Sequence, residues 1–333
     1  MRWVIWMAVM VGGAGTPAAE GPRIGAADLA QVRLIPVQHE GRCSPLDTLA
    51  RDVVGQVAET SRWSGRDPVL DLLDWTFRPE VYRDEPLLHV GGAEVRRLIG
   101  LPIDRASFSL RFLAEHEGLQ RRLVNVMTKR RQGERLDALD QKVEQLGSRM
   151  TLLEEVLEDE MIRPIPDPND PSGRWRALSS SNSDDDEPTR TARQRWEQVK
   201  AAFRADDPPR FRMATAALLE SLGHLQGAHR PDIRRMELEL RYNTLDPFGR
   251  SWWLSAVAAL TALVSLTARR RWVDGVVWLV LAGVFGLVTY GIGMRWHLAG
   301  RIPAANMYES LILMGWGLCL ACLLYTSPSP RDS

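Results

Sequence analysis

The chain has 333 residues, enough for about two domains, and its 42 basic and 42 acidic residues give a formal net charge of zero. A balanced chain has no overall basic field, which argues against nucleic acid as a partner. The charges are unevenly distributed, because residues 20–250 are charge-rich whereas residues 252–325 are mostly apolar. The sequence therefore predicts a polar domain followed by a membrane domain.

Residues 1–19 have the pattern of a secretory signal peptide. Arg2 precedes an apolar run that extends to Val11, and small residues follow up to Ala19. The apolar run is shorter than a membrane-spanning helix requires, so we expect cleavage near its end and export of the residues that follow. An uncleaved N-terminal anchor is the alternative.

Helical periodicity dominates the predicted exported domain, residues 20–163. Apolar residues recur in steps of three and four between Leu136 and Leu157, with charged residues around them. This a/d seam predicts either a partner-binding coiled coil or, as the favoured interpretation, one arm of a hairpin that pairs with residues 110–127. We therefore expect a mainly α domain with a coiled-coil-like hairpin.

A linker rich in Pro, Ser and acidic residues is predicted over residues 164–195. Four prolines end the preceding helix, and the acidic run 184–187 follows them. We expect this run to be a flexible, solvated loop. Helical patterning resumes over residues 196–250, and short strands are expected only near residues 32–37 and 87–90.

Three apolar stretches are long enough, or nearly so, to cross a membrane: residues 252–268, 275–294 and 307–325. Tryptophans lie near their ends, as is usual at membrane interfaces. Three consecutive arginines, 269–271, join the first two stretches, and the positive-inside rule places this link in the cytoplasm. The polar domain then lies on the external side, in agreement with the predicted signal peptide.

Polar groups occupy the start of the third apolar stretch. Pro303 suits the first turn of a helix. Asn306, Glu309 and Ser310 then fall on one helical face. A charged side chain costs roughly 2.5–3.5 kcal/mol at the centre of a bilayer, so Glu309 must face protein or water. Hydrogen bonds from its neighbours, or an ion pair with an arginine, would offset this cost.

Two regions carry a resemblance to a known family. Near the third apolar stretch, a G-(H/R)-x-P-x-x-N-x-Y-E-S signature is matched by Gly300, Arg301, Pro303, Asn306, Tyr308, Glu309 and Ser310. Residues 34–50, which contain Leu-Ile-Pro-Val-Gln, Gly-Arg and Pro-Leu-Asp-Thr-Leu-Ala, and residues 242–248 resemble stretches that precede the membrane part in extended bacterial members. The chain thus resembles the CcsA/ResC family of System II cytochrome c maturation, multi-spanning proteins that move haem outward and attach it to apocytochrome c.

The resemblance implies a multi-pass protein of the bacterial inner membrane, with residues 20–250 in the periplasm. It implies haem as cofactor, and apocytochrome c and a ResB/CcsB-like membrane protein as partners. The family attaches haem as a cytochrome c synthase, but its tryptophan-rich haem-binding segment is absent from this chain, so enzymatic activity stays open. Residues 326–333 read as an artefactual tail on a truncated chain. The alternative function is a non-enzymatic, membrane-anchored scaffold for an exported assembly complex.

Three residues are candidates for contact with haem. Arg295 and Arg301 carry positive charge that could attract the propionates. His297 is the histidine of the apolar part and a candidate axial ligand, but one histidine cannot supply two axial ligands. The sequence predicts no catalytic residue and no metal-binding cluster. Glu309 is interpreted either as a latch between helices or as a haem contact.

Overall fold

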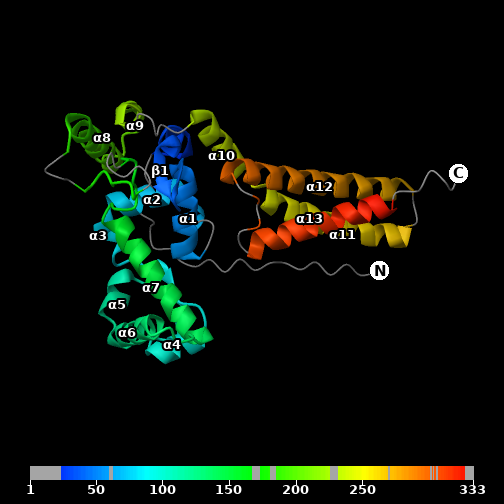
Figure 1. The fold of residues 1–333 in the computed structure, drawn as a ribbon, viewed down its shortest axis with the longest axis horizontal. Helices are drawn as coiled ribbons and strands as arrows, with labels where there is room; N and C mark the ends of the chain where they lie inside the picture. Colours follow the sequence, from blue (N-terminus) through cyan, green and yellow to red (C-terminus); the bar gives the residue numbers. More distant parts are fainter. Residues whose placement is uncertain are drawn as a thin grey trace, which may run out of the picture.

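The computed structural model describes residues 24–59, 63–166, 173–180, 185–225, 232–268, 271–300, 302, 304 and 307–326. The predicted signal peptide and the predicted artefactual tail lie outside these residues. Helices dominate the part that is described, which confirms the mainly α class. The charge-rich residues form a helical domain, and three apolar helices extend from one side of it (Figure 1).

A β-hairpin lies near the start of the domain. Strand β1 (Pro36–His39) pairs antiparallel with strand β2 (Arg42–Pro45). The two residues between them, Glu40 and Gly41, have φ angles of 50° and 75°. Two successive left-handed residues form the type I′ turn that matches the twist of a two-residue hairpin. The sequence indicated a strand near residues 32–37 but not its partner strand.

The remaining elements of the domain are short near the start and long towards the end. The single-turn 3₁₀ helices are Ala26–Leu29, Val32–Leu34 and Trp63–Gly65. A second hairpin pairs β3 (Leu88–His89) with β4 (Ser107–Phe108). The helices are α1 (Leu46–Ala58), α2 (Pro68–Phe77), α3 (Pro79–Tyr82), α4 (Ala93–Ile99), α5 (Leu110–Glu115), α6 (Glu117–Arg131), α7 (Ala138–Leu157), α8 (Glu187–Arg204), α9 (Pro208–Leu225) and α10 (Ile233–Leu245).

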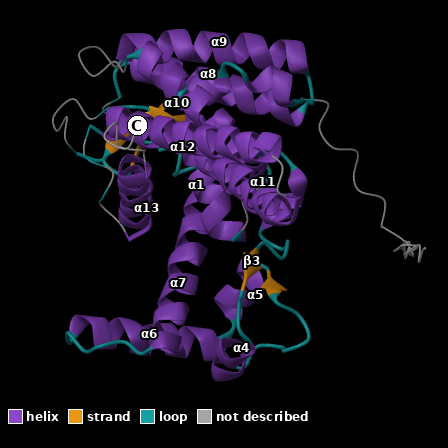
Figure 2. Ribbon diagram, turned by 90° about the vertical axis from the view of Figure 1, so that its right-hand side faces the viewer, coloured by secondary structure: helices purple, strands orange, loops and turns teal. Residues whose placement is uncertain are grey.

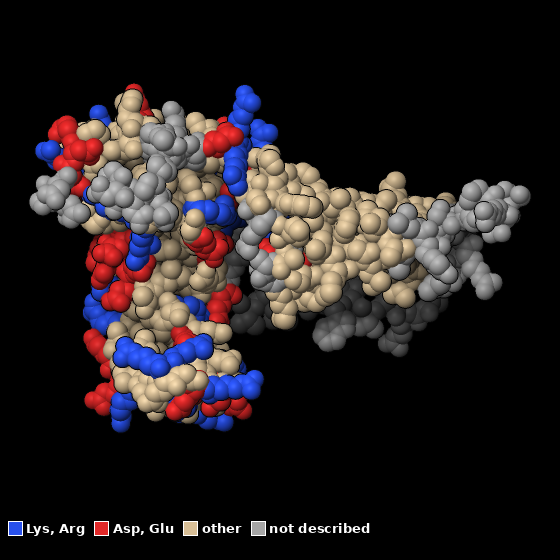
Figure 3. Space-filling view, viewed as in Figure 1, with Lys and Arg blue, Asp and Glu red and all other residues tan. Residues whose placement is uncertain are grey.

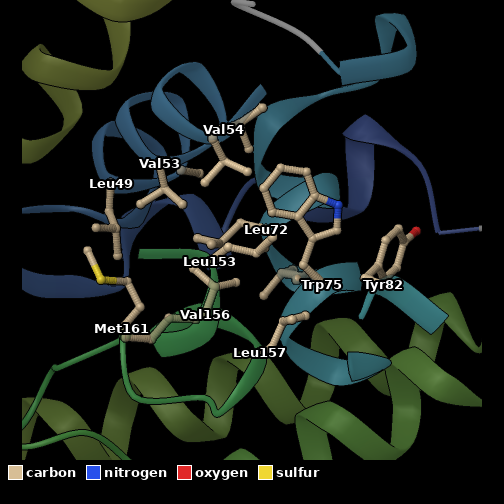
Figure 4. Close-up of a cluster of buried hydrophobic side chains, with 14 of the residues drawn as sticks. Leu49, Val53, Val54, Leu72, Trp75, Tyr82, Leu153, Val156, Leu157 and Met161 are labelled. Atoms are coloured by element: carbon tan, nitrogen blue, oxygen red, sulfur yellow. The ribbon is translucent and has the colours of Figure 1, made fainter. Parts of the chain in front are cut away.

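The core of the domain lies where α1, α2 and the C-terminal half of α7 meet (Figure 4). Its fully buried side chains include Leu49, Val54, Leu72, Trp75, Leu153 and Val156. Full burial of one such side chain contributes about 1.5–3 kcal/mol. The hydrophobic effect at this meeting point therefore holds together segments that are about a hundred residues apart in the chain.

The predicted seam of α7 is buried, but not against a single partner helix. Its N-terminal half packs against α6, which crosses α7 at a steep angle (Figure 2). The close approach depends on Gly147, where a Cβ atom would lie 2.7 Å from a methyl group of Leu123. The C-terminal half packs on α1 and α2. The heptad pattern identified the buried face, whereas the crossing angle depends on small residues such as Gly147.

The structure differs from the solvated linker that was predicted over residues 164–195, because the end of this range folds against the domain. Asp186 is the N-cap residue of α8, and its carboxylate accepts a hydrogen bond from a backbone N–H. Asp185 is buried and pairs with Arg176 at 2.9 Å and with Arg193 at 2.8 Å. Composition alone suggests a solvated acidic run, but arginines on both sides of it neutralise the buried charge.

A second group of buried charges lies on α2. Arg66 contacts Asp71 at 3.0 Å and Asp74 at 2.9 Å, and the hydroxyl of Tyr82 donates a hydrogen bond to Asp74 at 2.6 Å. Asp71 and Asp74 are almost fully buried. Burial raises the pKa of Asp71 to about 6, although Arg66 opposes this change.

The three predicted apolar stretches form helices α11 (Pro247–Ala268), α12 (Arg271–Ala299) and α13 (Met307–Thr326). Among the residues that the structure describes, Gly275–Leu298 is the one stretch long and apolar enough to cross a membrane, and Met307–Ala321 is a shorter apolar helix. Their surface is almost without charge (Figure 3), and large side chains such as Trp253, Leu279 and Leu318 are exposed. An apolar surface of this extent needs a lipid or protein environment.

Candidate functional site where α10 meets the apolar helices

An ion pair joins α12 to α13 at the ends of these helices that face the domain. The Nε atom of Arg295 donates a hydrogen bond to Oε1 of Glu309 at 2.8 Å. The Glu309 side chain is 8% exposed and that of Arg295 is 39% exposed. The carboxylate thus has the arginine partner that its position in an apolar helix requires.

Helix α10 contacts this ion pair from the side of the domain. Burial raises the pKa of the Tyr242 hydroxyl above its ordinary value, and the neighbouring guanidinium of Arg295 opposes this change. Arg235, two turns earlier, donates a hydrogen bond to the carbonyl of Leu298 near the end of α12. The ion pair and the end of α12 are therefore both attached to α10.

Other residues of α10 bind the start of the domain. Arg42 donates two hydrogen bonds to Glu239, at 3.0 and 2.9 Å, and Thr48 donates a third at 2.8 Å. The amide of Asn243 donates to Asp47 at 3.2 Å and to Thr48 at 3.0 Å. We call these five residues the α10 socket.

The socket contains two buried carboxylates, and both are satisfied. Glu239 is 5% exposed and Asp47 is fully buried. Asp47 is also paired with Arg33 and with Arg51, the latter at 2.7 Å. A buried carboxylate costs several kcal/mol unless it is paired and hydrogen-bonded, so each arginine is needed to keep the socket intact.

A free thiol lies beside the socket. Cys43 is half-buried on strand β2. Burial, and next the negative charge of Glu239, raise the pKa of the Cys43 thiol to about 11.

The residues predicted for the site are partly brought together. Arg295 and Glu309 form the ion pair, and Tyr308 lines a small cavity beside them together with Phe248. Ser310 donates a hydrogen bond to the backbone carbonyl of Ala304 at 3.4 Å. His297 is exposed near the end of α12, and Gly300 ends that helix with a φ of 66°. Three predicted residues lie outside the described residues: Arg301, Pro303 and Asn306.

The described residues fit a haem only in part. His297 offers one exposed imidazole, and the described residues hold no cluster of three or more metal-ligating side chains. A haem iron that is held by two axial protein ligands would need another donor besides His297. Arg295 is already paired with Glu309, which reduces its capacity to bind a propionate. We therefore assign no haem-ligation step to these residues.

No motif or spacing singled out Glu239 and Arg235 before their contacts were known. Glu239 lies on the face of α10 that also carries the buried Met236, at a spacing of three residues. A glutamate at a position where an apolar residue is expected is the one signal that could have identified it, because a buried acid needs a dedicated partner.

Comparison with known proteins shows a likeness over most of the chain. No family model matches the chain. The chain is similar to Protein NrfI of Wolinella succinogenes, with 25% identity over 318 residues that cover 86% of this chain and 32% of the relative. The chain thus spans about a third of the length of this relative. The polar domain and the apolar helices each make up less than 86% of the chain. The likeness therefore extends over both.

Proposed function

We propose that the chain takes part in cytochrome c maturation as a membrane protein that handles haem and delivers or attaches it to apocytochrome c. The likeness to Protein NrfI supports a role in cytochrome c maturation. Haem delivery is the finer part of the proposal and is based on the resemblance to the CcsA/ResC signature.

One observation carries the proposal: the stretches that bear the resemblance meet in space although they are far apart in sequence. Residues 34–50 supply the domain side of the socket, and Asn243 occupies it. Tyr242, next to Asn243, contacts Arg295, which is paired with Glu309 of the signature. Three stretches chosen for their sequence alone would not be expected to converge unless they serve a common site.

In this proposal the chain is a multi-pass protein of the bacterial inner membrane with three spans, α11 to α13. The arginines at 269–271 lie in the cytoplasm, and the domain and the Arg295–Glu309 pair lie on the periplasmic side. Apocytochrome c and a ResB/CcsB-like membrane protein are the proposed partners. The site is then at the surface where haem would leave the membrane.

The test is to purify the chain from haem-sufficient cells and to record its absorbance between 380 and 440 nm, roughly the Soret region of haem proteins. In parallel, c-type cytochromes are measured in a strain that lacks the gene. We expect a Soret band in the purified protein, and loss of covalent cytochrome c in the deletion strain. A colourless protein together with normal cytochrome c would refute the proposal.

A groove in the domain favours a second candidate, the membrane-anchored scaffold. A groove of about 790 Å³ lies between α6 and α7. Its apolar lining includes Val124 and Met127, which are 65% and 59% exposed. Exposed apolar side chains in a groove are typical of partner-binding surfaces. Replacement of Met127 by Glu should then abolish the binding of an assembly partner, while haem content stays unchanged.

A further inference from the structure

We infer that the α10 socket positions the Arg295–Glu309 pair, so that Glu239 and Asn243 are positioning residues for the proposed site rather than only parts of the domain. This inference deepens the proposed function and depends on it for its biological meaning. Physically, it states that the contacts between the domain and α10 determine where the ends of α12 and α13 lie.

The first step is the geometry of α10. On a helix with 3.6 residues per turn, Arg235 and Tyr242 are seven residues apart and lie in one row. Glu239 and Asn243 are four residues apart and lie in the adjacent row. One row contacts α12 and the other contacts the domain. A rotation of α10 therefore cannot change one set of contacts without changing the other.

The second step is the asymmetry of the two sets of contacts. The domain side consists of charge-assisted hydrogen bonds to a carboxylate that is 5% exposed. The side facing α12 consists of a tyrosine hydroxyl and one hydrogen bond to a backbone carbonyl. Both contacts with α12 also involve an arginine, but each sets one guanidinium against a neutral oxygen, whereas Arg42 binds a carboxylate through two hydrogen bonds. Paired ions with two parallel hydrogen bonds are the stronger contact, so the socket sets the position of α10. Tyr242 and Arg235 then transmit that position to Arg295 and Leu298.

The third step is the chain that joins the two parts. Asp246 ends α10 in the left-handed conformation with a φ of 43°, and α11 begins at Pro247. The link between α10 and α11 is thus a single residue. Phe248, in the first turn of α11, lines the cavity beside Arg295 and Glu309. A displacement of α10 is therefore passed to the start of α11 as well.

The test measures hydrogen–deuterium exchange in the whole chain in detergent or nanodiscs. Glu239→Gln removes the charge that binds Arg42 but keeps the shape of the side chain. We expect exchange at residues 292–300 and 307–312 to rise about tenfold, which corresponds to about 1.4 kcal/mol. Arg42→Gln should have the same effect, and the double variant should add little to either, because both remove one coupled interaction.

Glu237→Gln is the matched control. Glu237 is exposed on the opposite face of α10, and the same replacement there should leave exchange unchanged. If Glu239→Gln speeds exchange in residues 233–245 but not at the ends of α12 and α13, the socket only stabilises α10 and the inference is wrong. If that variant does not fold, Thr48→Val, which removes only the hydroxyl that Glu239 and Asn243 share, provides the same comparison.

Cytochrome c levels separate this inference from the proposed function. If a strain that lacks the gene makes normal cytochrome c, the proposed function fails, and exchange alone decides the positioning role. If cytochrome c is lost in the deletion strain, cells with Glu239→Gln should make less of it than cells with Glu237→Gln, and equal amounts would contradict a role of the socket in the site.

Discussion

At the scale of single residues, buried carboxylates mark the places where distant parts of the chain are joined. Glu239 joins α10 to the hairpin, and Glu309 joins α13 to α12. Each is paired with an arginine that keeps some contact with solvent. Such pairs add little net stability compared with apolar residues of similar size, but they penalise any arrangement that separates them.

Replacement of Arg295 tests the pair between α12 and α13. Arg295→Gln should lower the free energy of unfolding by about 1–3 kcal/mol, because the buried carboxylate of Glu309 loses this partner. Arg241→Gln, on the exposed face of α10, should change it by less than about 0.5 kcal/mol. Thermal or denaturant unfolding in detergent measures both. Equal losses in the two variants would show that Glu309 gains nothing from Arg295.

The buried carboxyl of Asp71 should make stability depend on pH. Its folded pKa of about 6 lies above the ordinary value of 3.8, so the folded state binds more protons than the unfolded state between these values. Stability from this group is therefore greatest below pH 4 and declines as the pH rises through 6, by up to about 3 kcal/mol. Asp71→Asn removes this dependence.

Unfolding of the wild-type chain and of Asp71→Asn between pH 4.5 and about pH 7.5 measures the effect. The stability of the wild type relative to the variant should decrease with rising pH over this interval. A difference that stays constant would mean that the carboxyl of Asp71 titrates alike in the folded and unfolded states.

At the scale of elements, the turn between β1 and β2 is set by backbone conformation. Gly41 has a φ of 75°, whereas Gly55 lies within α1 with open space around its Cβ position. Gly41→Ala should destabilise the protein by about 1 kcal/mol, because L-residues are strained there. Gly55→Ala should stabilise it by about 0.5–1 kcal/mol. Chemical denaturation compares the two, and the same sign for both would contradict this account.

Periodicity and length predicted the long elements well. The seam of α7 and the three apolar helices were visible because each repeats one pattern over several turns. The pattern failed at Asp185, where two arginines outside the acidic run make burial possible. It also failed to give the partner of β1, because a four-residue strand carries too little periodicity to be recognised.

The candidate site could be predicted only at its motif residues. Glu309 stood out because a carboxyl group in an apolar helix is energetically costly unless it has a partner or contacts water. Its partner Arg295 could be named as a candidate but not paired, since 14 residues and a helix boundary separate the two. The socket could not be predicted, because it depends on contacts between residues about 190 positions apart, such as Thr48 and Glu239.

At the scale of the whole molecule, the proposed orientation in the membrane can be tested directly. Alkaline phosphatase, which is active only after export, can be fused after residue 250, 270 or 300. We expect activity at the first and third sites and none at the second, because the arginines at 269–271 are retained in the cytoplasm. Activity after residue 270 would overturn the three-span arrangement.

The thiol beside the socket has a consequence for chemistry that involves sulfur. With a pKa of about 11, only about one Cys43 in 10⁴ is ionised at neutral pH, and the thiolate is the reactive form. Electrophiles and disulfides should therefore react slowly with it. In a maturation pathway that joins haem vinyl groups to cysteines of apocytochrome c, such a thiol does not compete with the acceptor for its modification.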